Sequence, residues 1–245
     1  MRTSLFVVAL VLSGTAHADV TRKVPDFTGV QVAAGIHATV ETGAFAPITL
    51  RGDDAVLKTI RTEVKDGTLY IGWEPNTHLS REGKVTAIVR MPRATSLGVS
   101  GGAQMEASVP AGDTFAIAAS GGGTLKLTNK VTTKRFSLSV SGGSRTTLAG
   151  VDAVDMSIAI SGGSRVSFGG KGGSANATLS GAAILDAEML QVDTLSVEGS
   201  GGSRAELRAT RQVSGALSGG SRVRVSKSAD VRVSLSGGSQ VDRDL

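Results

Sequence analysis

Residues 136–146 read FSLSVSGGSRT, and the Ser-Gly pair inside this stretch belongs to a regular series along the 245-residue chain. The series has eight members, which begin at Ser100, Ser120, Ser141, Ser161, Ser180, Ser200, Ser218 and Ser236. Consecutive members lie 18 to 21 residues apart, and four of them extend to Ser-Gly-Gly-Ser-Arg. A sequence period close to 20 residues is typical of solenoid proteins, in which each repeat stacks on the previous one.

Apolar and polar residues alternate on both sides of the motif. Phe136, Leu138 and Val140 precede one serine at every second position, and Val166 and Phe168 follow another motif in the same way. A period of two indicates a β-strand with one buried face. Each repeat is therefore predicted to hold a strand, a bend and a second strand. We predict an all-β fold, a parallel β-helix or solenoid with rungs of about 20 residues.

Glycine is abundant, with 33 residues, and the bend explains why it recurs. A sharp corner repeated on every rung needs a positive φ or a close backbone approach, and glycine supplies both at little cost. The structural turn residues expected from this argument are Gly142, Gly162, Gly201, Gly219 and Gly237. The leading serine of each motif is expected to stack and to form hydrogen bonds along the column of corners.

Residues 1–18 resemble a secretory signal peptide. Arg2 precedes an apolar core from Leu5 to Leu12, and Ala16-His17-Ala18 supplies the small residues of a cleavage site. We expect cleavage after Ala18 and a periplasmic or secreted protein; a short buried or anchoring segment is the alternative. The apolar run is too short to span a bilayer, and no later stretch is long enough.

The composition excludes several classes of protein. The chain has no cysteine, so it offers no lipid-anchored cysteine, disulfide or thiolate metal site. Its net charge of +5, or +4 without Arg2, is too small to indicate a nucleic-acid-binding protein. Aromatic residues make up only 3% of the chain, which favours a narrow core of Val, Ile, Leu and Ala.

Residues 19–98 differ from the repeats and are predicted to form a β-rich N-terminal cap, continuous with a solenoid over residues 99–245. This segment contains the single Trp73 and the single Tyr70. Strands are expected within residues 29–40, 68–73 and 85–90. One short helix is also expected, capped by Asp53 or Asp54. Its apolar stripe would consist of Val56, Leu57, Ile60 and Val64.

Three segments resemble a bacterial family of unknown function, the "putative auto-transporter adhesin, head GIN domain" family. They are residues 27–30 (FTGV), residues 65–71 (KDGTLYI) and the Ser-Gly-Gly series. The Gly-Ile-Asn element of the family would correspond to Gly35-Ile36-His37, with histidine in place of asparagine. The resemblance covers roughly residues 20–240 and implies a β-solenoid and, by analogy with the name, surface binding. It implies no site residues.

No catalytic or metal-binding constellation is evident, and no cofactor is expected. After the leader, the only histidines are His37 and His78, too far apart in sequence to form a ligand motif. A polysaccharide lyase or hydrolase is the enzyme alternative, because such activities occur on β-helices. It would need paired carboxylates. The candidate pairs, Asp152 with Asp155 and Asp186 with Glu188, fall at predicted corners.

The residue after each complete motif is arginine, which predicts a column of Arg145, Arg165, Arg204 and Arg222 interrupted by Ile184. The next outward column reads Glu106, Lys126, Thr147, Ser167, Asp186, Glu206, Arg224 and Asp242, and the two columns together carry a net charge of +2. Two interpretations stay open. The columns form a solvated face with local Arg–Glu pairing, or the arginines bind an anionic polymer such as an acidic polysaccharide or lipopolysaccharide.

A further column, two residues before each motif, reads Gly98, Ala118, Ser139, Ala159, Thr178, Glu198, Ala216 and Ser234. Small residues there either suit a crowded parallel sheet or leave a smooth strip for self-association as a homo-oligomer. The functional hypothesis is an exported, non-catalytic, adhesin-like protein that binds an envelope protein or a glycan. The alternatives are a polysaccharide-active enzyme and a purely structural envelope protein.

Overall fold

The computed structural model describes residues 17–75 and 84–245. The apolar core of the expected leader and His78 lie outside the described residues. The N-terminal part comprises β1 (His17–Arg22), β2 (Gly29–Val32), β3 (His37–Thr42), β4 (Ile48–Asp53), α1 (Asp54–Leu57), β5 (Ile60–Lys65), β6 (Thr68–Trp73) and β7 (Thr86–Met91). The repeats comprise β8 (Ala94–Val99), β9 (Gln104–Ser108), β10 (Ala111–Ala119), β11 (Thr124–Val140), β12 (Arg145–Ile160), β13 (Arg165–Leu179), β14 (Ile184–Gly199), β15 (Arg204–Leu217), β16 (Arg222–Val225), β17 (Asp230–Leu235) and β18 (Gln240–Arg243).

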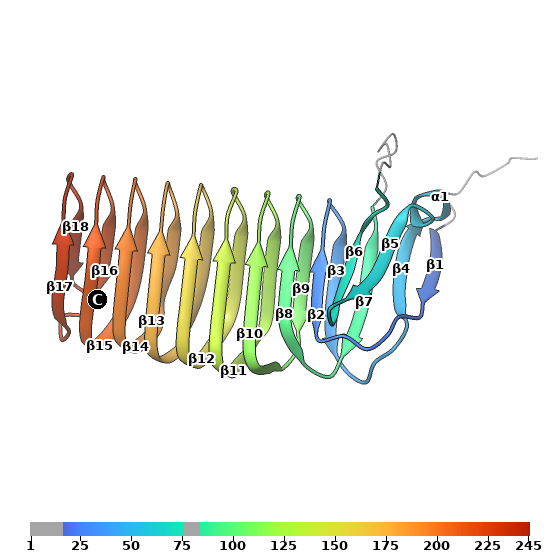
Figure 1. Cartoon of the computed structure of the whole chain (residues 1–245), viewed down its shortest axis with the longest axis horizontal. Coiled ribbons are helices and arrows are strands. Elements are labelled where there is room, and N and C mark those ends of the chain that lie inside the picture. Colours follow the sequence, from blue (N-terminus) through green and yellow to red (C-terminus); the bar gives the residue numbers. More distant parts are fainter. Residues whose placement is uncertain (1–16, 76–83) are drawn as a thin grey trace, which may run out of the picture.

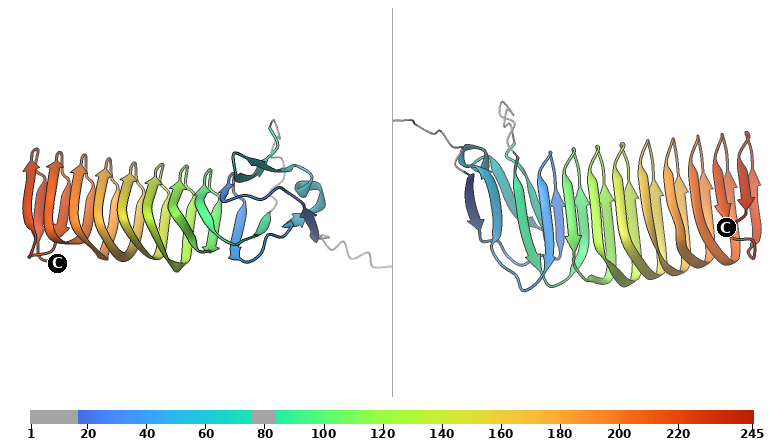
Figure 2. Two further views of the ribbon diagram at one scale, coloured as in Figure 1. Left: turned by 60° about the horizontal axis from the view of Figure 1, so that its bottom comes forward. Right: turned by 180° about the vertical axis from the view of Figure 1, so that it is seen from behind.

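The repeats form a parallel β-solenoid, as the period predicted. From β8 onward each rung pairs in parallel with the next, as where Arg145 lies opposite Arg165 and Ile160 opposite Leu179. Figure 1 shows the rungs stacked along the long axis, and Figure 2 shows the same order from two further directions, with the irregular N-terminal elements gathered at one end.

Each rung has two flat faces joined at the Ser-Gly-Gly corner. We call one the strip face; it consists of β2, β6, β8, β10, β17 and the second halves of β11–β15. The other is the ladder face, made of β3, β7, β9, β16, β18 and the first halves of β11–β15. Alternate side chains of both faces point inward and are buried.

The core is narrow and is filled by aliphatic columns with few rings. Phe136 lies beside Phe115 and Phe168, with ring centroids 6.2 and 6.0 Å apart, so these three aromatic side chains form one cluster in the core. All three are at most 4% exposed. A core only two sheets thick has little room for more rings, which accounts for the low aromatic content.

The corner glycines repeat one backbone conformation from rung to rung. The φ angles of Gly142, Gly162, Gly201, Gly219 and Gly237 are +65°, +68°, +73°, +69° and +60°. A Cβ added at Gly142 would lie 3.0 Å from the amide nitrogen of Gly121 on the preceding rung. The stack therefore needs glycine for two reasons, because a side chain would strain the turn and would also press against the neighbouring corner.

The expected hydrogen bonding of the leading serines along the column is confirmed at two corners, where Ser218 Oγ donates to the Gly199 carbonyl at 3.4 Å and Ser236 Oγ donates to the Leu217 carbonyl at 3.5 Å. The fourth residue of the motif is the buried one: Ser144, for example, is 1% exposed and its Oγ donates a 2.7 Å hydrogen bond to the Ser141 carbonyl. Ser221 bonds the Ser218 carbonyl in the same way, at 2.8 Å. The leading serines also donate their backbone N–H groups to the preceding rung, as from Ser141 to the Ala119 carbonyl.

The predicted helix is shorter than expected. Asp53 caps α1 by accepting bonds from the backbone N–H groups of Ala55 and Val56, but the helix ends at Leu57. Ile60 and Val64, assigned to its apolar stripe, lie instead in β5. The reason is the Asp66-Gly67 turn, whose φ angles of +49° and +71° fold β5 back onto β6 as an antiparallel hairpin.

The strand order at the N-terminal end does not follow the sequence. The β2–β3 rung lies between the rung of β6 and β7 and the rung of β8 and β9, so an early segment is inserted between two later ones (Figure 1). Gly35-Ile36-His37 lies in the corner of this rung, with Gly35 at φ +74°. The Gly35 N–H donates to the Gly101 carbonyl, which joins this corner to the Ser-Gly-Gly column.

Antiparallel strands cover the N-terminal end of the stack. β1 pairs with β4, β4 with β7, and β5 with β6. The Arg22 guanidinium donates to the carbonyls of Leu57 and Ile60 and to Thr62 Oγ1, and so ties β1 to the end of α1 and to β5. The described residues contain no helix long and apolar enough to cross a membrane.

Candidate functional site

The arginine column lies in register on the ladder face. Arg145 is opposite Arg165, Ile184 follows, and Arg204 is opposite Arg222. The four arginines project from the first residues of β12, β13, β15 and β16, immediately after the corner, and all four are exposed. Adjacent parallel strands place Arg145 and Arg165 about 5 Å apart along the column. We call this column the arginine ladder.

The neighbouring column supplies partners for only part of this charge. Arg224 bonds Glu206 Oε1 and Asp244 Oδ1, both at 3.2 Å. Arg222 lies 3.7 Å from Asp242 and also donates to Gln240 Oε1 at 2.6 Å. These contacts provide partners for the arginine side chains at the C-terminal end of the two columns, where acidic residues are most frequent.

Arg145, Arg165 and Arg204 have no ion pair or side-chain hydrogen bond within residues 17–75 and 84–245. The second-column residues beside Arg145 and Arg165 are Thr147 and Ser167, which carry no charge. The two adjacent arginines thus present ten N–H donors to solvent from fixed strands. This arrangement can bind anionic groups that repeat along a polymer.

The ion pairs on the solenoid surface lower the pKa of their carboxyl groups. The hydrogen bond from the Arg224 guanidinium holds the pKa of Asp244 below its usual range. On another part of the solenoid, the hydrogen bond from the Lys134 ammonium lowers the pKa of Asp113 in the same way. Both carboxyl groups are exposed, so these contacts add little to stability.

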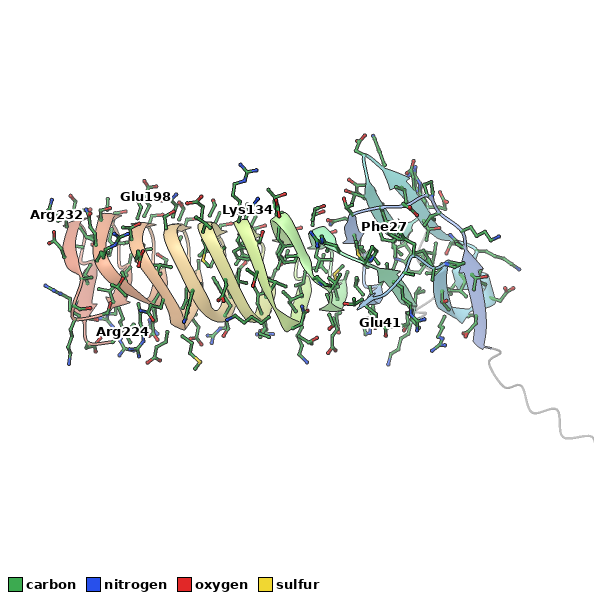
Figure 3. The ribbon with its side chains drawn as sticks, turned by 90° about the horizontal axis from the view of Figure 1, so that it is seen from below. Phe27, Glu41, Lys134, Glu198, Arg224 and Arg232 are labelled. Carbon is green, nitrogen blue, oxygen red and sulfur yellow. The ribbon has the colours of Figure 1, made fainter. Side chains whose placement is uncertain are left out.

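The strip face is smooth over much of its length. Ala118, Ser139, Ala159, Thr178, Glu198, Ala216 and Ser234 lie in one exposed column. Gly98 continues the column but is buried, because the side chain of Gln31 extends over it. Figure 3 shows that Glu198 projects from the opposite side of the stack to Arg224, so the strip and the ladder face away from each other.

Self-association through the strip has a direct test. We expect Ala159→Arg/Ala216→Arg to stay folded, because both side chains are exposed, and to be monomeric by light scattering even where the wild type is a dimer. Two buried arginines without partners would cost several kcal/mol at such an interface. A matched variant, Ala149→Arg on the ladder face, should leave the mass of the wild-type particle unchanged. A wild type that is already monomeric contradicts self-association.

The carboxylate pairs considered for catalysis make structural contacts. Asp152 accepts from the Lys171 N–H at 3.0 Å and forms a 2.7 Å ion pair with Lys130. Asp155 accepts from Ser174 Oγ at 2.7 Å. Asp186 and Glu188 line a surface groove of about 400 Å³, and Glu188 lies 3.4 Å from Arg208.

His37 is exposed at the start of β3. Among residues 17–75 and 84–245, no group of three or more His, Cys, Asp or Glu side chains is placed to hold a metal ion.

Two features of the surface were not foreseen. Gln240 extends the ladder beyond Arg222, and the 18-residue spacing from Arg222 was the signal that could have revealed it. A groove around Tyr70 at the N-terminal end of the strip face was also missed. Its side chains come from three strands that are not neighbours in the repeat pattern, so no sequence period could reveal it.

Residues 26–229 match the family described as "putative auto-transporter adhesin, head GIN domain". The fold is similar to crystal structures of a putative adhesin from Parabacteroides merdae ATCC 43184 (17% identity, TM-score 0.84, 94% of this chain and 96% of the other) and of one from Parabacteroides distasonis ATCC 8503 (21%, 0.85, 94% and 97%). A protein from P. distasonis ATCC 8503 described as a putative lipid binding protein is similar too (14%, 0.84, 94% and 97%). Comparison with curated proteins found no match.

Proposed function

Because the chain belongs to the auto-transporter adhesin head GIN domain family, we propose that it is an exported, adhesin-like binding protein without catalytic activity. The observation that carries this proposal is the arginine ladder, in which three of the four members, Arg145, Arg165 and Arg204, project from one face without a partner among the described residues. The ligand that fits such a face is an anionic polymer, such as an acidic polysaccharide of the cell envelope.

The electrostatic repulsion between neighbouring arginines is small enough for the protein to tolerate without a ligand. Two unit charges about 5 Å apart repel by roughly 0.9 kcal/mol in water before screening by salt. A polymer with carboxylate or sulfate groups removes this repulsion and gains charge-assisted hydrogen bonds. Because the arginines start from paired strands, little backbone entropy is lost when the ligand binds.

Export rests on the leader sequence and is compatible with the fold. Cleavage after Ala18 would remove the first two residues of β1 and leave Asp19, whose carboxylate forms a 3.1 Å ion pair with Arg51 on β4. The antiparallel pairing of β1 with β4 from Asp19 to Arg22 would remain. The mature protein would therefore keep the strand that covers the N-terminal end.

We expect the wild type to be retained on immobilised heparin at low salt and released at moderate salt, since exposed ion pairs are screened. Arg145→Ala/Arg165→Ala should weaken the affinity about tenfold, because each exposed charge contact contributes up to about 1 kcal/mol. The measurement is the salt concentration at elution, repeated with acidic glycans and confirmed by titration.

The matched control is Arg211→Ala/Arg232→Ala, which removes the same formal charge. Arg211 and Arg232 already form ion pairs with Asp193 and Asp230, so this variant should elute close to the wild type. Retention that survives the ladder substitutions, or that does not depend on salt, would rule out the ladder as the binding site. Depolymerisation of an acidic polysaccharide by the wild type would contradict the non-catalytic assignment.

A further inference from the structure

The strip face ends in a groove formed by β2, β5 and β6, on the opposite side of the stack from the arginine ladder. The groove has a volume of about 480 Å³ and is lined by Gln31, Arg61, Glu63, Lys65, Tyr70 and Trp73. This volume is within the range of small-molecule sites, roughly 300–1,000 Å³. The only tyrosine and the only tryptophan of the chain meet here, although aromatic residues are scarce elsewhere.

Strand pairing sets the wall and the floor of the groove. Tyr70 is opposite Gln31 on one side and Glu63 on the other, so these three side chains share one face of the sheet. The next row contains Arg61, Gly72, which has no side chain, and Ala33, which has only a methyl group. Gly72 and Ala33 form the floor of the groove, and the side chains of Arg61 and of the row of Tyr70 form its walls.

Several lining groups are held by contacts that leave them facing the groove. Trp73 Nε1 donates a 2.8 Å hydrogen bond to the Ala34 carbonyl, which fixes the indole. Arg61 and Glu63, two residues apart on β5, form an ion pair. The guanidinium and the carboxylate therefore offer fixed donors and acceptors.

Gln31 is positioned by the glycine on its other side. A Cβ added at Gly98 would lie 1.9 Å from Gln31 Oε1, so the carboxamide occupies the space that a side chain at position 98 would fill. Beside it, Tyr70 is 44% exposed. Gly98 is thus a positioning residue, because it leaves room for the carboxamide of Gln31.

An exposed ring with a carboxamide and a carboxylate–guanidinium pair around it complements a sugar. The C–H face of a pyranose is apolar and stacks on an aromatic ring, while its hydroxyl groups point outward to donors and acceptors. A lipid chain would need walls without charges, but Arg61, Glu63 and Lys65 place three charged groups in the lining. The charges of Arg61 and Glu63 cancel and leave only Lys65, so a neutral ligand fits best.

We propose that this groove binds a neutral oligosaccharide, with one pyranose ring stacked on Tyr70. The proposal rests on the proposed adhesin-like function and extends it to a second ligand class on the other face of the solenoid. A protein with both sites would hold two different glycans at once, one along the ladder and one at the end of the strip.

The test titrates the full chain with maltotriose, cellotriose and chitotriose, and with sialyllactose as the acidic comparison. Binding is followed by the fluorescence of Trp73 and by saturation-transfer NMR. We expect at least one trisaccharide to shift the Trp73 emission and to receive saturation from the protein. Tyr70→Ala should weaken this binding about tenfold, since an aromatic stack contributes up to about that factor. Tyr70→Phe, which keeps the ring, should stay within about threefold of the wild type.

Two controls separate the groove from the rest of the protein. Phe45→Ala removes an exposed ring of similar accessibility, 39%, outside the groove and should leave sugar binding unchanged. Gly98→Ala, which displaces Gln31 without touching the ligand, should weaken binding while the circular dichroism stays the same.

The proposal is overturned if no trisaccharide binds at about 10 mM, if Tyr70→Ala binds as the wild type does, or if only acidic trisaccharides such as sialyllactose bind. Heparin retention of the same variants distinguishes the two sites. Tyr70→Ala should keep the heparin retention of the wild type, and Arg145→Ala/Arg165→Ala should keep its trisaccharide binding.

Discussion

A chain that lacks residues 161–179 should fold with one rung fewer, whereas a chain that lacks only residues 170–179 should not fold. In the first deletion Ile160 is joined to Ser180. Because Ile160 pairs with Leu179, and Arg165 with Ile184, the new rung presents the same columns to its neighbours. Solenoid stability is close to a sum of rung and nearest-neighbour contributions, so we expect the melting temperature to fall by less than about 10 °C.

The second deletion removes a strip-face strand without the ladder-face strand that leads to it. Gly169 would then be joined directly to Ser180, although they lie at opposite ends of a rung. The five missing strip residues alone span roughly 16 Å, and no chain remains to cross that distance. We expect loss of cooperative unfolding by circular dichroism and an aggregated species by size exclusion. Equal damage from both deletions would contradict the assigned register.

The other large effect is expected at Gly215, where alanine should lower the stability by about 4 kcal/mol, or the melting temperature by roughly 10 °C. Gly215 lies opposite Val197 on β14, with φ +139°. A Cβ there would lie 1.9 Å from the Val197 carbonyl oxygen and 2.7 Å from its carbon. The backbone must shift to accept it, in a φ region that is almost exclusive to glycine.

Gly163→Ala is the matched control for this substitution. Gly163 is the second glycine of its corner, but a Cβ there has no atom within 4 Å and its φ is not in the positive region. Its melting temperature should stay within about 3 °C of the wild type, a change of no more than about 1 kcal/mol. The comparison is made by thermal unfolding under identical conditions. Similar melting temperatures for Gly215→Ala and Gly163→Ala would show that the close approach at Gly215 is not needed.

Much of the solenoid could be predicted from residues close together in the chain. The alternation of apolar and polar residues around Phe136, Leu138 and Val140 indicates a strand with one buried face. The spacing of the corner motif indicates the length of a rung. Once the rung length is known, residues one period apart must share a column. The arginine ladder, including its interruption at Ile184, follows from this arithmetic.

The sequence period places residues in columns, but it does not predict which side chains within the columns bond each other, because that depends on the length and direction of each side chain. Arg224 forms an ion pair with Asp244, although Asp242 is its register partner. Asp242 forms an ion pair with Arg222 instead. Arg145 and Arg165 have no partner in the part of the chain that the structure describes, because the neighbouring positions on their rungs hold Thr147 and Ser167.

The structure of the N-terminal end was the hardest part to predict from the sequence, because it depends on pairing between segments that are distant in the chain. Ile60 and Val64 fit a helical stripe, yet hairpin formation with β6 gives both residues a buried or half-buried place in a strand. The β2–β3 rung is inserted between later rungs, and the groove at Tyr70 exists only because β2 and β5 flank β6. Periodicity is a property of neighbours along the chain and predicts how one rung is built. The inserted rung, the hairpin and the groove depend on the free energy of contacts between strands that are distant in the sequence. Only the tertiary structure shows which of those strands pair.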